Sequence, residues 1–117
     1  MVEDDELIQR MYVRVFTKAG FEVKTANDGE QGILAASEFM PDLIIMDVMM
    51  PNLNGIQALE AIKGNDSTKA IPVIMLSADD DGTLMMKAMQ LGANRFLVKS
   101  AFEPNQVVGI VKSVLNG

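Results

Sequence analysis

The chain has 117 residues and a net charge of −6, with 49% hydrophobic and 22% charged residues, which is typical of one globular domain over residues 1–117. The acidic balance without a basic stripe argues against direct nucleic-acid binding, and no apolar run approaches the roughly 20 residues that cross a membrane, so we expect a cytoplasmic protein. His and Cys are absent, so any chemistry must use carboxylates, hydroxyls, lysines and a hard metal ion.

Helical and extended patterns alternate along the chain. An apolar stripe at helical spacing predicts a first helix over 6–19, with Gly20 as its C′ residue. Alternating apolar and polar residues then predict a strand over 21–26. The later predicted helices are a weaker one over 30–39, one that carries Ile56, Leu59 and Ile62 on one side, one over 82–91 and one over 104–115. The later predicted strands cover 43–46, 72–76 and 95–98, and a loop is predicted over 51–55.

This alternation, with short connections, predicts right-handed βαβ units and a doubly wound parallel sheet covered on both faces. Ligands of such sheets bind at the carboxyl ends of the strands. The residues expected there are Asp47, Ser77 and Lys99, together with Glu3, Asp4 and Asp5 at the start of the chain. Any one acidic residue after a strand is more often a solvated helix cap. The whole set, however, brings carboxylates, one hydroxyl and one ammonium to the same edge.

Such a set suits phosphoryl transfer to a carboxylate. Mg²⁺ prefers oxygen ligands and typically takes one or two carboxylates plus phosphate oxygens. A carboxylate can attack phosphorus if metal and Lys neutralise the anionic charges. In this interpretation Asp47 attacks, Asp4 and Asp47 hold the metal, and Ser77 and Lys99 bind phosphoryl oxygens.

The motifs and their spacing resemble the receiver domain of bacterial response regulators, from Val2 to about Leu115. The matching segments are Glu3-Asp4, Asp47-Val-Met-Met-Pro51 with Gly55, Leu76-Ser-Ala78, and Lys99 after Phe96-Leu-Val98. The resemblance implies a flavodoxin-like fold with strand order 2-1-3-4-5 and a Mg²⁺ cofactor. It also implies a two-component signalling role, in which a sensor histidine kinase or phosphotransfer protein phosphorylates Asp47 and so switches a partner-binding surface.

The resemblance further implies individual roles at the metal. Asp47 would be the phosphoacceptor and Asp4 the direct acidic ligand. Glu3 would act through a metal-bound water, and Met49 through its backbone carbonyl.

Other residues would act on the phosphoryl group. Ser77, the Ala78 backbone and Lys99 would bind it, and Phe96 would change rotamer as Ser77 moves. Met49 and Asp79 would tune dephosphorylation. The downstream partner would bind the face formed by the fourth helix, the last strand and the last helix, with a dimer as one option. The chain would accept phosphoryl on itself and lose it again, without being a turnover enzyme.

Several residues also have plainer interpretations, which do not depend on the resemblance. Phe96 could be an ordinary core aromatic, and Met85, Met86 and Met89 could be core filler or a partner-facing patch. The run Asp79-Asp80-Asp81 is better explained as a helix N-cap than as a second metal site. Asp5 and Glu6 are expected to begin the first helix.

The sequence departs from the family pattern in two places. Only Met1 and Val2 precede the acidic pair, where the family has a full central strand. We therefore expect a stunted strand of two to four residues, with the gap filled by repacking or by another chain. The second departure is Lys99-Ser100-Ala101-Phe102, where the family has Lys-Pro-Phe with a cis peptide. Since cis costs about 2.5–4 kcal/mol before a residue other than Pro, we expect a trans Lys99–Ser100 bond.

Two other functions compete with the phosphoacceptor role. One is a Mg²⁺-dependent phosphohydrolase with an Asp nucleophile, although the sequence has no insertion long enough for a substrate cap. The other is a phosphorylation-silent receiver that acts as a docking or dimerisation module, which the short first strand keeps open.

Overall fold

The computed structural model describes residues 1–50 and 53–117, so Pro51 and Asn52 of the predicted loop lie outside the described residues. In chain order the elements are α1 (Glu6–Lys18), α2 (Gly29–Phe39), β1 (Ile44–Asp47), α3 (Gly55–Lys63), β2 (Val73–Ser77), α4 (Gly82–Gln90), β3 (Arg95–Val98), the 3₁₀ helix η1 (Lys99–Ala101) and α5 (Pro104–Asn116). All five predicted helices and the three later predicted strands are present.

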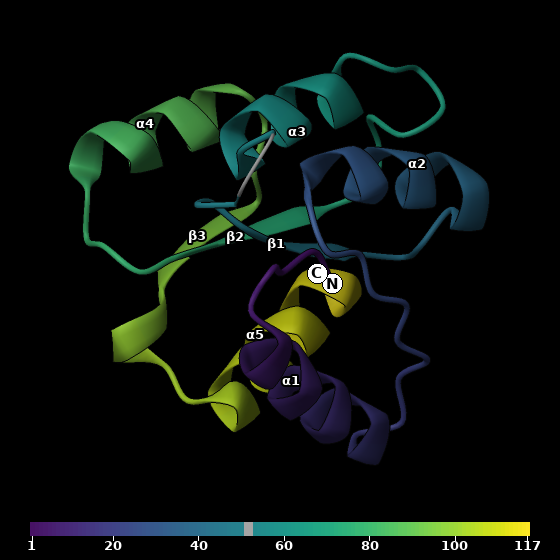
Figure 1. Cartoon of the computed structure of the whole chain (residues 1–117), viewed down its shortest axis with the longest axis vertical. Helices are drawn as coiled ribbons and strands as arrows, with labels where there is room; N and C mark the ends of the chain where they lie inside the picture. Colours follow the sequence, from purple (N-terminus) through teal and green to yellow (C-terminus); the bar gives the residue numbers. More distant parts are fainter. Residues whose placement is uncertain (51–52) are drawn as a thin grey trace.

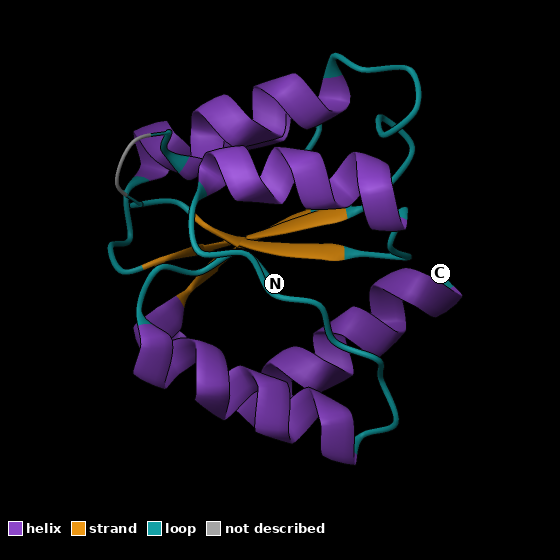
Figure 2. Cartoon of the chain, turned by 45° about the vertical axis from the view of Figure 1, so that its right-hand side comes forward, coloured by secondary structure: helices purple, strands orange, loops and turns teal. Residues whose placement is uncertain are grey.

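The strands form a parallel sheet between two layers of helices. α2, α3 and α4 cover one face, and α1 and α5 cover the other (Figures 1 and 2). β1 pairs with β2 and β2 pairs with β3. Every residue of β1 and β2 is buried, as expected for parallel strands covered on both faces. The predicted α/β fold is confirmed.

Alternate residues of the strands build two separate cores. Met46 and Met75 belong to the core that includes Ala58 and Leu59 of α3. Their neighbours Ile45, Ile74 and Leu76 belong to the second core, on the side of α1 and α5. The sheet is therefore clamped by apolar contacts on both faces, which fixes where its strand ends lie.

The prediction of a regular strand over 21–26 was wrong. Among the described residues of this segment, Ala26 alone is paired, by a single parallel bridge to Val2. Val2 also bridges to Met46, so one residue joins the segment to β1, which is consistent with the predicted strand order. A strand needs a neighbour of similar length, and here Met1 and Val2 are the only residues ahead of Glu3 that can pair.

Local features agree with the sequence. Asp5 caps α1 by accepting from the Leu7 and Ile8 amides, and Asp81 caps α4 in the same way. Gly20 has φ +97°, the left-handed conformation expected of a C′ glycine. Within the described residues every peptide is trans, so the trans prediction for Lys99–Ser100 is confirmed. The helices described are each too short or too polar to span a bilayer.

Gly32 of α2 tests how strongly the sheet depends on the position of Val2. A Cβ at Gly32 would lie 2.8 and 3.0 Å from the two γ carbons of Val2. A Cβ at Gly109 of α5 would have no described atom within 4 Å. Both changes to Ala gain about 1 kcal/mol of helix propensity. We expect Gly32→Ala to be about 1–3 kcal/mol less stable than Gly109→Ala, because overpacking displaces Val2.

Urea unfolding of the two variants measures this difference directly. Equal unfolding free energies would mean that Val2 moves aside at no cost and that its two bridges contribute little.

Candidate functional site

Three acidic side chains converge at the carboxyl end of β1. Glu3, Asp4 and Asp47 each offer a carboxylate oxygen, and these oxygens lie within 4.8 Å of one another. Glu3 and Asp47 are 1% and 4% exposed, whereas Asp4 is exposed. The cluster therefore has a buried floor and one side open to solvent.

The backbone ladder brings Glu3 and Asp47 together. The Glu3 amide donates to the Ala26 carbonyl at 3.0 Å, and the Asp47 amide donates to the Val2 carbonyl at 2.9 Å. On its other side β1 is tied to β2, where the Val48 amide donates to the Leu76 carbonyl at 2.9 Å. Short as the first strand is, its pairing places Glu3 beside Asp47.

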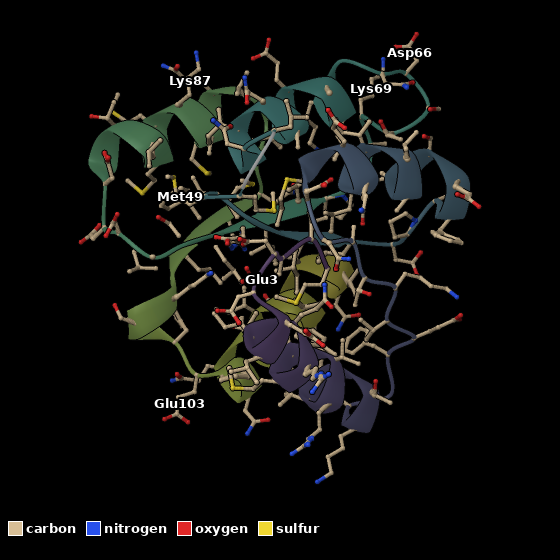
Figure 3. The ribbon with its side chains drawn as sticks, viewed as in Figure 1. Glu3, Met49, Asp66, Lys69, Lys87 and Glu103 are labelled. Carbon is tan, nitrogen blue, oxygen red and sulfur yellow. The ribbon has the colours of Figure 1, made fainter. Side chains whose placement is uncertain are left out.

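Lys99 brings the last strand to the same point. Its Nζ lies 2.9 Å from Glu3 Oε1 and 3.2 Å from Asp47 Oδ1. Figure 3 shows Glu3 near the middle of the molecule, whereas the exposed pair Asp66–Lys69 lies at the periphery. Solvent screens an exposed pair strongly and a buried one much less. The attraction between Lys99 and the two carboxylates is therefore screened less by solvent than that of the Asp66–Lys69 pair.

The pKa values of Glu3 and Lys99 are shifted by burial and by the neighbouring charges. Burial raises the pKa of the Glu3 carboxyl, and the neighbouring Asp47 raises it further, while Lys99 and the Asp5 amide offset only part of this. Burial by itself would lower the pKa of Lys99, but Glu3 and Asp47 together raise it. Two buried carboxylates share one ammonium, so a further cation would relieve their repulsion.

The donor set suits a hard divalent cation. Carboxylate oxygens are the ligands that Mg²⁺ prefers, and Mg²⁺ keeps several of its waters. The exposed Asp4 leaves room for such waters, while Glu3 and Asp47 provide the buried side. Among the described residues this is the acidic group close enough to hold an ion, and Asp79, Asp80 and Asp81 form no such group with one another.

Ser77 ends β2, the strand next to β1. Its side chain is 1% exposed, and its hydroxyl donates to the Asp79 carbonyl at 2.7 Å. The same oxygen accepts from the Asp79 amide at 3.1 Å. Ser77 thus lies at the predicted edge, with its hydroxyl bound to the following loop. Ala78 and Asp79 are exposed in that loop.

Phe96 and Met49 lie around the acidic cluster rather than in it. Phe96 pairs in register with Met75 and packs, half-buried, against the core that includes Ala88 of α4. Met49 is 65% exposed and lies in the loop that follows β1 (Figure 3). Phe96 therefore packs on the face of the sheet that α2, α3 and α4 cover (Figure 1), and the side chain of Met49 is exposed.

Sequence reasoning missed the contribution of Gln9. Its Nε2 donates to the Glu3 carbonyl at 3.1 Å, the Ala26 carbonyl at 3.3 Å and the Asn27 Oδ1 at 3.1 Å. Gln9 therefore ties the short first strand to the segment beside it. Nothing in the helical pattern distinguishes Gln9 from an ordinary polar residue, so no sequence signal pointed to this role.

Gly55 allows α3 to begin directly against the acidic strand end. Its amide donates to the Val48 carbonyl at 2.8 Å, and a Cβ at this position would collide with the Asp47 carbonyl oxygen. Asn54 and Gln57 form a capping box at the same helix start. A glycine is required here by the close backbone approach, which the motif spacing in the sequence had only suggested.

Comparison with known proteins adds independent information. Residues 1–112 match the family model described as the response regulator receiver domain. The chain is 33% identical over 115 residues to the alkaline phosphatase synthesis transcriptional regulatory protein PhoP of Bacillus subtilis, covering 98% of this chain and 47% of PhoP. It spans about half, or less, of the length of the curated relatives it matches.

Solved structures agree with the sequence matches. A putative response regulator from Chloroflexus aurantiacus superposes with a TM-score of 0.90 at 33% identity, covering 99% of this chain and 94% of that one. A second match, from the CheX–CheY–BeF3–Mg²⁺ complex of Borrelia burgdorferi, has a TM-score of 0.87 at 32% identity, with 97% and 84% covered.

The raised pKa of the Glu3 carboxyl predicts a pH dependence of folding. A carboxyl whose pKa is higher in the folded state stabilises the fold below its unfolded value of 4.5. This contribution is lost as the pH rises through the folded pKa. Glu3→Gln does not titrate, yet keeps an oxygen that can accept from Lys99. We expect the stability of Glu3→Gln relative to the unaltered chain to increase as the pH rises from 4.5 toward neutrality.

Urea unfolding in metal-free buffer across this pH range measures the difference. A stability difference that stays constant or falls with pH would contradict the charge imbalance described above.

Proposed function

Because the chain belongs to the response regulator receiver domain family, we propose that it signals by accepting a phosphoryl group on Asp47 beside a bound Mg²⁺. The observation that carries this proposal is the convergence of Glu3, Asp4 and Asp47 with Lys99 at one strand end. Receiver domains are signalling modules rather than turnover enzymes, and they interact with histidine kinases or phosphotransfer proteins and with downstream effectors. The carboxylates and the ammonium group that meet at this strand end support that role.

In the proposed reaction a carboxylate oxygen of Asp47 attacks phosphorus. The bond from phosphorus to a histidine nitrogen of the kinase or phosphotransfer protein breaks as the new P–O bond forms, and the imidazole keeps the electron pair. A small acyl phosphate can act as donor in the same way, releasing its carboxylate. Both reactants are anionic, so the reaction needs positive charge at the point of attack. Lys99, 3.2 Å from Asp47 Oδ1, is placed to supply part of it.

The rest of the positive charge that the reaction needs would come from the metal ion. Bound Mg²⁺ would neutralise the carboxylates and the incoming phosphoryl oxygens. We assign Asp4 and Asp47 as its acidic ligands, the Met49 carbonyl as a further ligand and Glu3 as a ligand through water. The fit of the donor set supports this assignment, as does the Borrelia match, whose complex contains BeF3 and Mg²⁺. Since Glu3 already pairs with Lys99 at 2.9 Å, an indirect role suits it.

The phosphoryl oxygens would be bound by Lys99, the Ser77 hydroxyl and the Ala78 amide. Ser77 would first have to release the Asp79 carbonyl, which it now contacts at 2.7 Å. Its movement would open space for Phe96 to rotate, and Phe96 packs against the core that includes Ala88 of α4. Phosphorylation would thereby bias the α4 surface, because a ligand shifts such an equilibrium only through its differential affinity for the two states.

We assign the face formed by α4, β3 and α5 as the surface read by a downstream partner in the cytoplasm. On α4, Met85, Met86 and Met89 are 44%, 62% and 46% exposed. The interpretation of these residues as core filler therefore gives way to that of a surface patch. Flexible thioether side chains suit an adaptable protein interface. The same patch could serve a dimer.

One observation favours a second candidate function. The first strand consists of a single bridging residue, Val2, and Glu3 and Asp4 follow it directly. Because so short a strand positions the proposed metal ligands only weakly, the domain could act as a phosphorylation-silent docking or dimerisation module. The complete acidic, hydroxyl and Lys set argues against this candidate.

The first test replaces the acceptor. Asp47→Asn keeps the size of the side chain but removes the nucleophilic carboxylate, so we expect labelling by acetyl phosphate and Mg²⁺ to be lost, as followed by intact-mass spectrometry. Asp66→Asn is the control, because Asp66 is exposed and its carboxylate pairs with Lys69 on the surface, at 3.0 Å. Undiminished labelling of Asp47→Asn would place the acceptor elsewhere. No labelling of the unaltered chain would favour the silent module.

A second test addresses dephosphorylation. We infer that Met49 and Asp79 flank the path of the attacking water. An amide can hold such a water, whereas a thioether is a weak acceptor, so Met49→Asn should lose phosphoryl severalfold faster than the unaltered chain. Met85→Asn makes the same change on α4 and should leave the rate unaltered. Equal decay of all three phosphorylated forms would remove Met49 from this role.

A further inference from the structure

The hydrogen bonds between the first strand and the segment beside it form a regular ladder. The Ala26 amide donates to the Met1 carbonyl at 2.9 Å, and the Glu3 amide donates to the Ala26 carbonyl at 3.0 Å. In a parallel ladder the next bond would join the Glu3 carbonyl to the amide two positions after Ala26, which belongs to Asp28. This next position lies on the side of the acidic cluster, away from Met1.

The segment turns into α2 at that position. Asp28 is the N-cap of α2, where its side chain accepts from the Gln31 amide at 2.9 Å. In the part of the chain that the structure describes, the Glu3 carbonyl accepts instead from the side chain of Gln9, whose Nε2 lies 3.1 Å away. The side-chain amide of Gln9 therefore takes the place of the next backbone donor in the ladder.

The side chain of Gln9 is held in place by two further contacts. Its Nε2 lies 3.3 Å from the Ala26 carbonyl and 3.1 Å from Asn27 Oδ1. Asn27 in turn donates its amide to Gln31 Oε1 at 3.0 Å, in the first turn of α2. One amide group of α1 thus connects the end of the first strand to the start of α2.

The peptide unit that Gln9 contacts leads directly into Asp4. Because a peptide unit is planar, a bond that fixes the Glu3 carbonyl also fixes the direction in which Asp4 leaves the backbone. Asp4 is exposed, so packing does little to orient its side chain. Its carboxylate nevertheless lies within 4.8 Å of those of Glu3 and Asp47, and Asp4 and Gln9 line one cavity.

We propose that Gln9 is a positioning residue for the divalent cation, because its side-chain amide fixes the Glu3–Asp4 peptide and so holds the Asp4 carboxylate toward Asp47. This inference rests on the proposed function, in which Asp4 and Asp47 are the acidic ligands of Mg²⁺. A ligand that is already oriented loses less conformational freedom when the ion binds. Groups that orient metal ligands without touching the ion contribute to metal affinity in this way.

The test replaces Gln9 by Met, which has a similar length and no hydrogen-bond donor. Mg²⁺ binding to the full chain is followed by the shifts of its backbone amide resonances in an NMR titration. We expect Gln9→Met to bind Mg²⁺ about fivefold more weakly than the unaltered chain, because the ion must then order the Glu3–Asp4 peptide itself. Without metal, the carbonyl carbon resonance of Glu3 should shift as its hydrogen bond is lost.

Gln31→Met is the matched control. It makes the same side-chain change and removes the acceptor of the Asn27 amide, but leaves the bond from Gln9 to the Glu3 carbonyl in place. We expect its Mg²⁺ affinity and its Glu3 carbonyl resonance to remain unchanged. Urea unfolding in metal-free buffer measures what each variant costs the fold. If both variants lose Mg²⁺ affinity in proportion to their stability, Gln9 has a structural role alone and the proposal is overturned.

Asn27→Ala is a milder change, because it removes one of the acceptors of the Gln9 side chain and leaves the Glu3 contact. It should weaken Mg²⁺ binding in the unaltered chain but not in Gln9→Met, since Asn27 would act through Gln9. An equal effect in both backgrounds would contradict the proposal. Should Gln9→Met fail to fold, an unchanged Mg²⁺ affinity of Asn27→Ala would overturn the proposal by itself.

Phosphorylation distinguishes this inference from the proposed function. At saturating Mg²⁺, acetyl phosphate should label Gln9→Met as fast as the unaltered chain, whereas at low Mg²⁺ the variant should be labelled more slowly. A rate lowered by the same factor at every Mg²⁺ concentration would mean that Gln9 does not act through the ion. Absence of Mg²⁺ binding by the unaltered chain would overturn both proposals, whereas equal Mg²⁺ binding by the unaltered chain and Gln9→Met would overturn this inference alone.

Discussion

The ammonium group of Lys99 lies between two buried carboxylates, 2.9 Å from Glu3 and 3.2 Å from Asp47. Without this contact, Glu3 and Asp47 would be two like charges held together out of reach of solvent. Burial, and after it the neighbouring Asp47, raise the pKa of the Glu3 carboxyl, and Lys99 offsets part of this. A further cation at this strand end would reduce the repulsion between the two carboxylates. The fold thus holds two carboxylates close together at the point where the proposed chemistry occurs.

The position of Glu3 depends in turn on very little backbone. Val2 alone bridges Ala26 and Met46, and Gln9 adds side-chain bonds to the Glu3 and Ala26 carbonyls. The backbone position of Glu3, and with it the geometry of the acidic cluster, therefore depends on a few hydrogen bonds around Val2.

The sequence predicted some residues of the candidate site and missed the positions or roles of others. Asp47, Ser77 and Lys99 were predicted because each follows an apolar run, and the carboxyl ends of parallel strands meet at one edge. Glu3 and Asp4 follow only Met1 and Val2, and their individual roles came from the resemblance to the family. The structure brings together Glu3, Asp4, Asp47 and Lys99. It leaves Ser77 bonded to Asp79 and Met49 exposed in its loop, positions that no spacing could reveal. The role of Gln9 was missed, because a polar residue on an amphipathic helix carries no sign of its partner.

By itself, the sequence determined the order and type of nearly all elements, the acidic residues at the starts of α1 and α4, and the restriction to oxygen and amine chemistry. These depend on residues a few positions apart, so periodicity and composition report them faithfully. Tertiary structure alone decided that residues 21–25 do not form a strand, despite their alternating pattern, because pairing requires a neighbour that the short first strand does not provide. It also decided that Lys99 reaches Glu3, a contact across 96 positions. Both outcomes arise from groups that meet only when the sheet assembles.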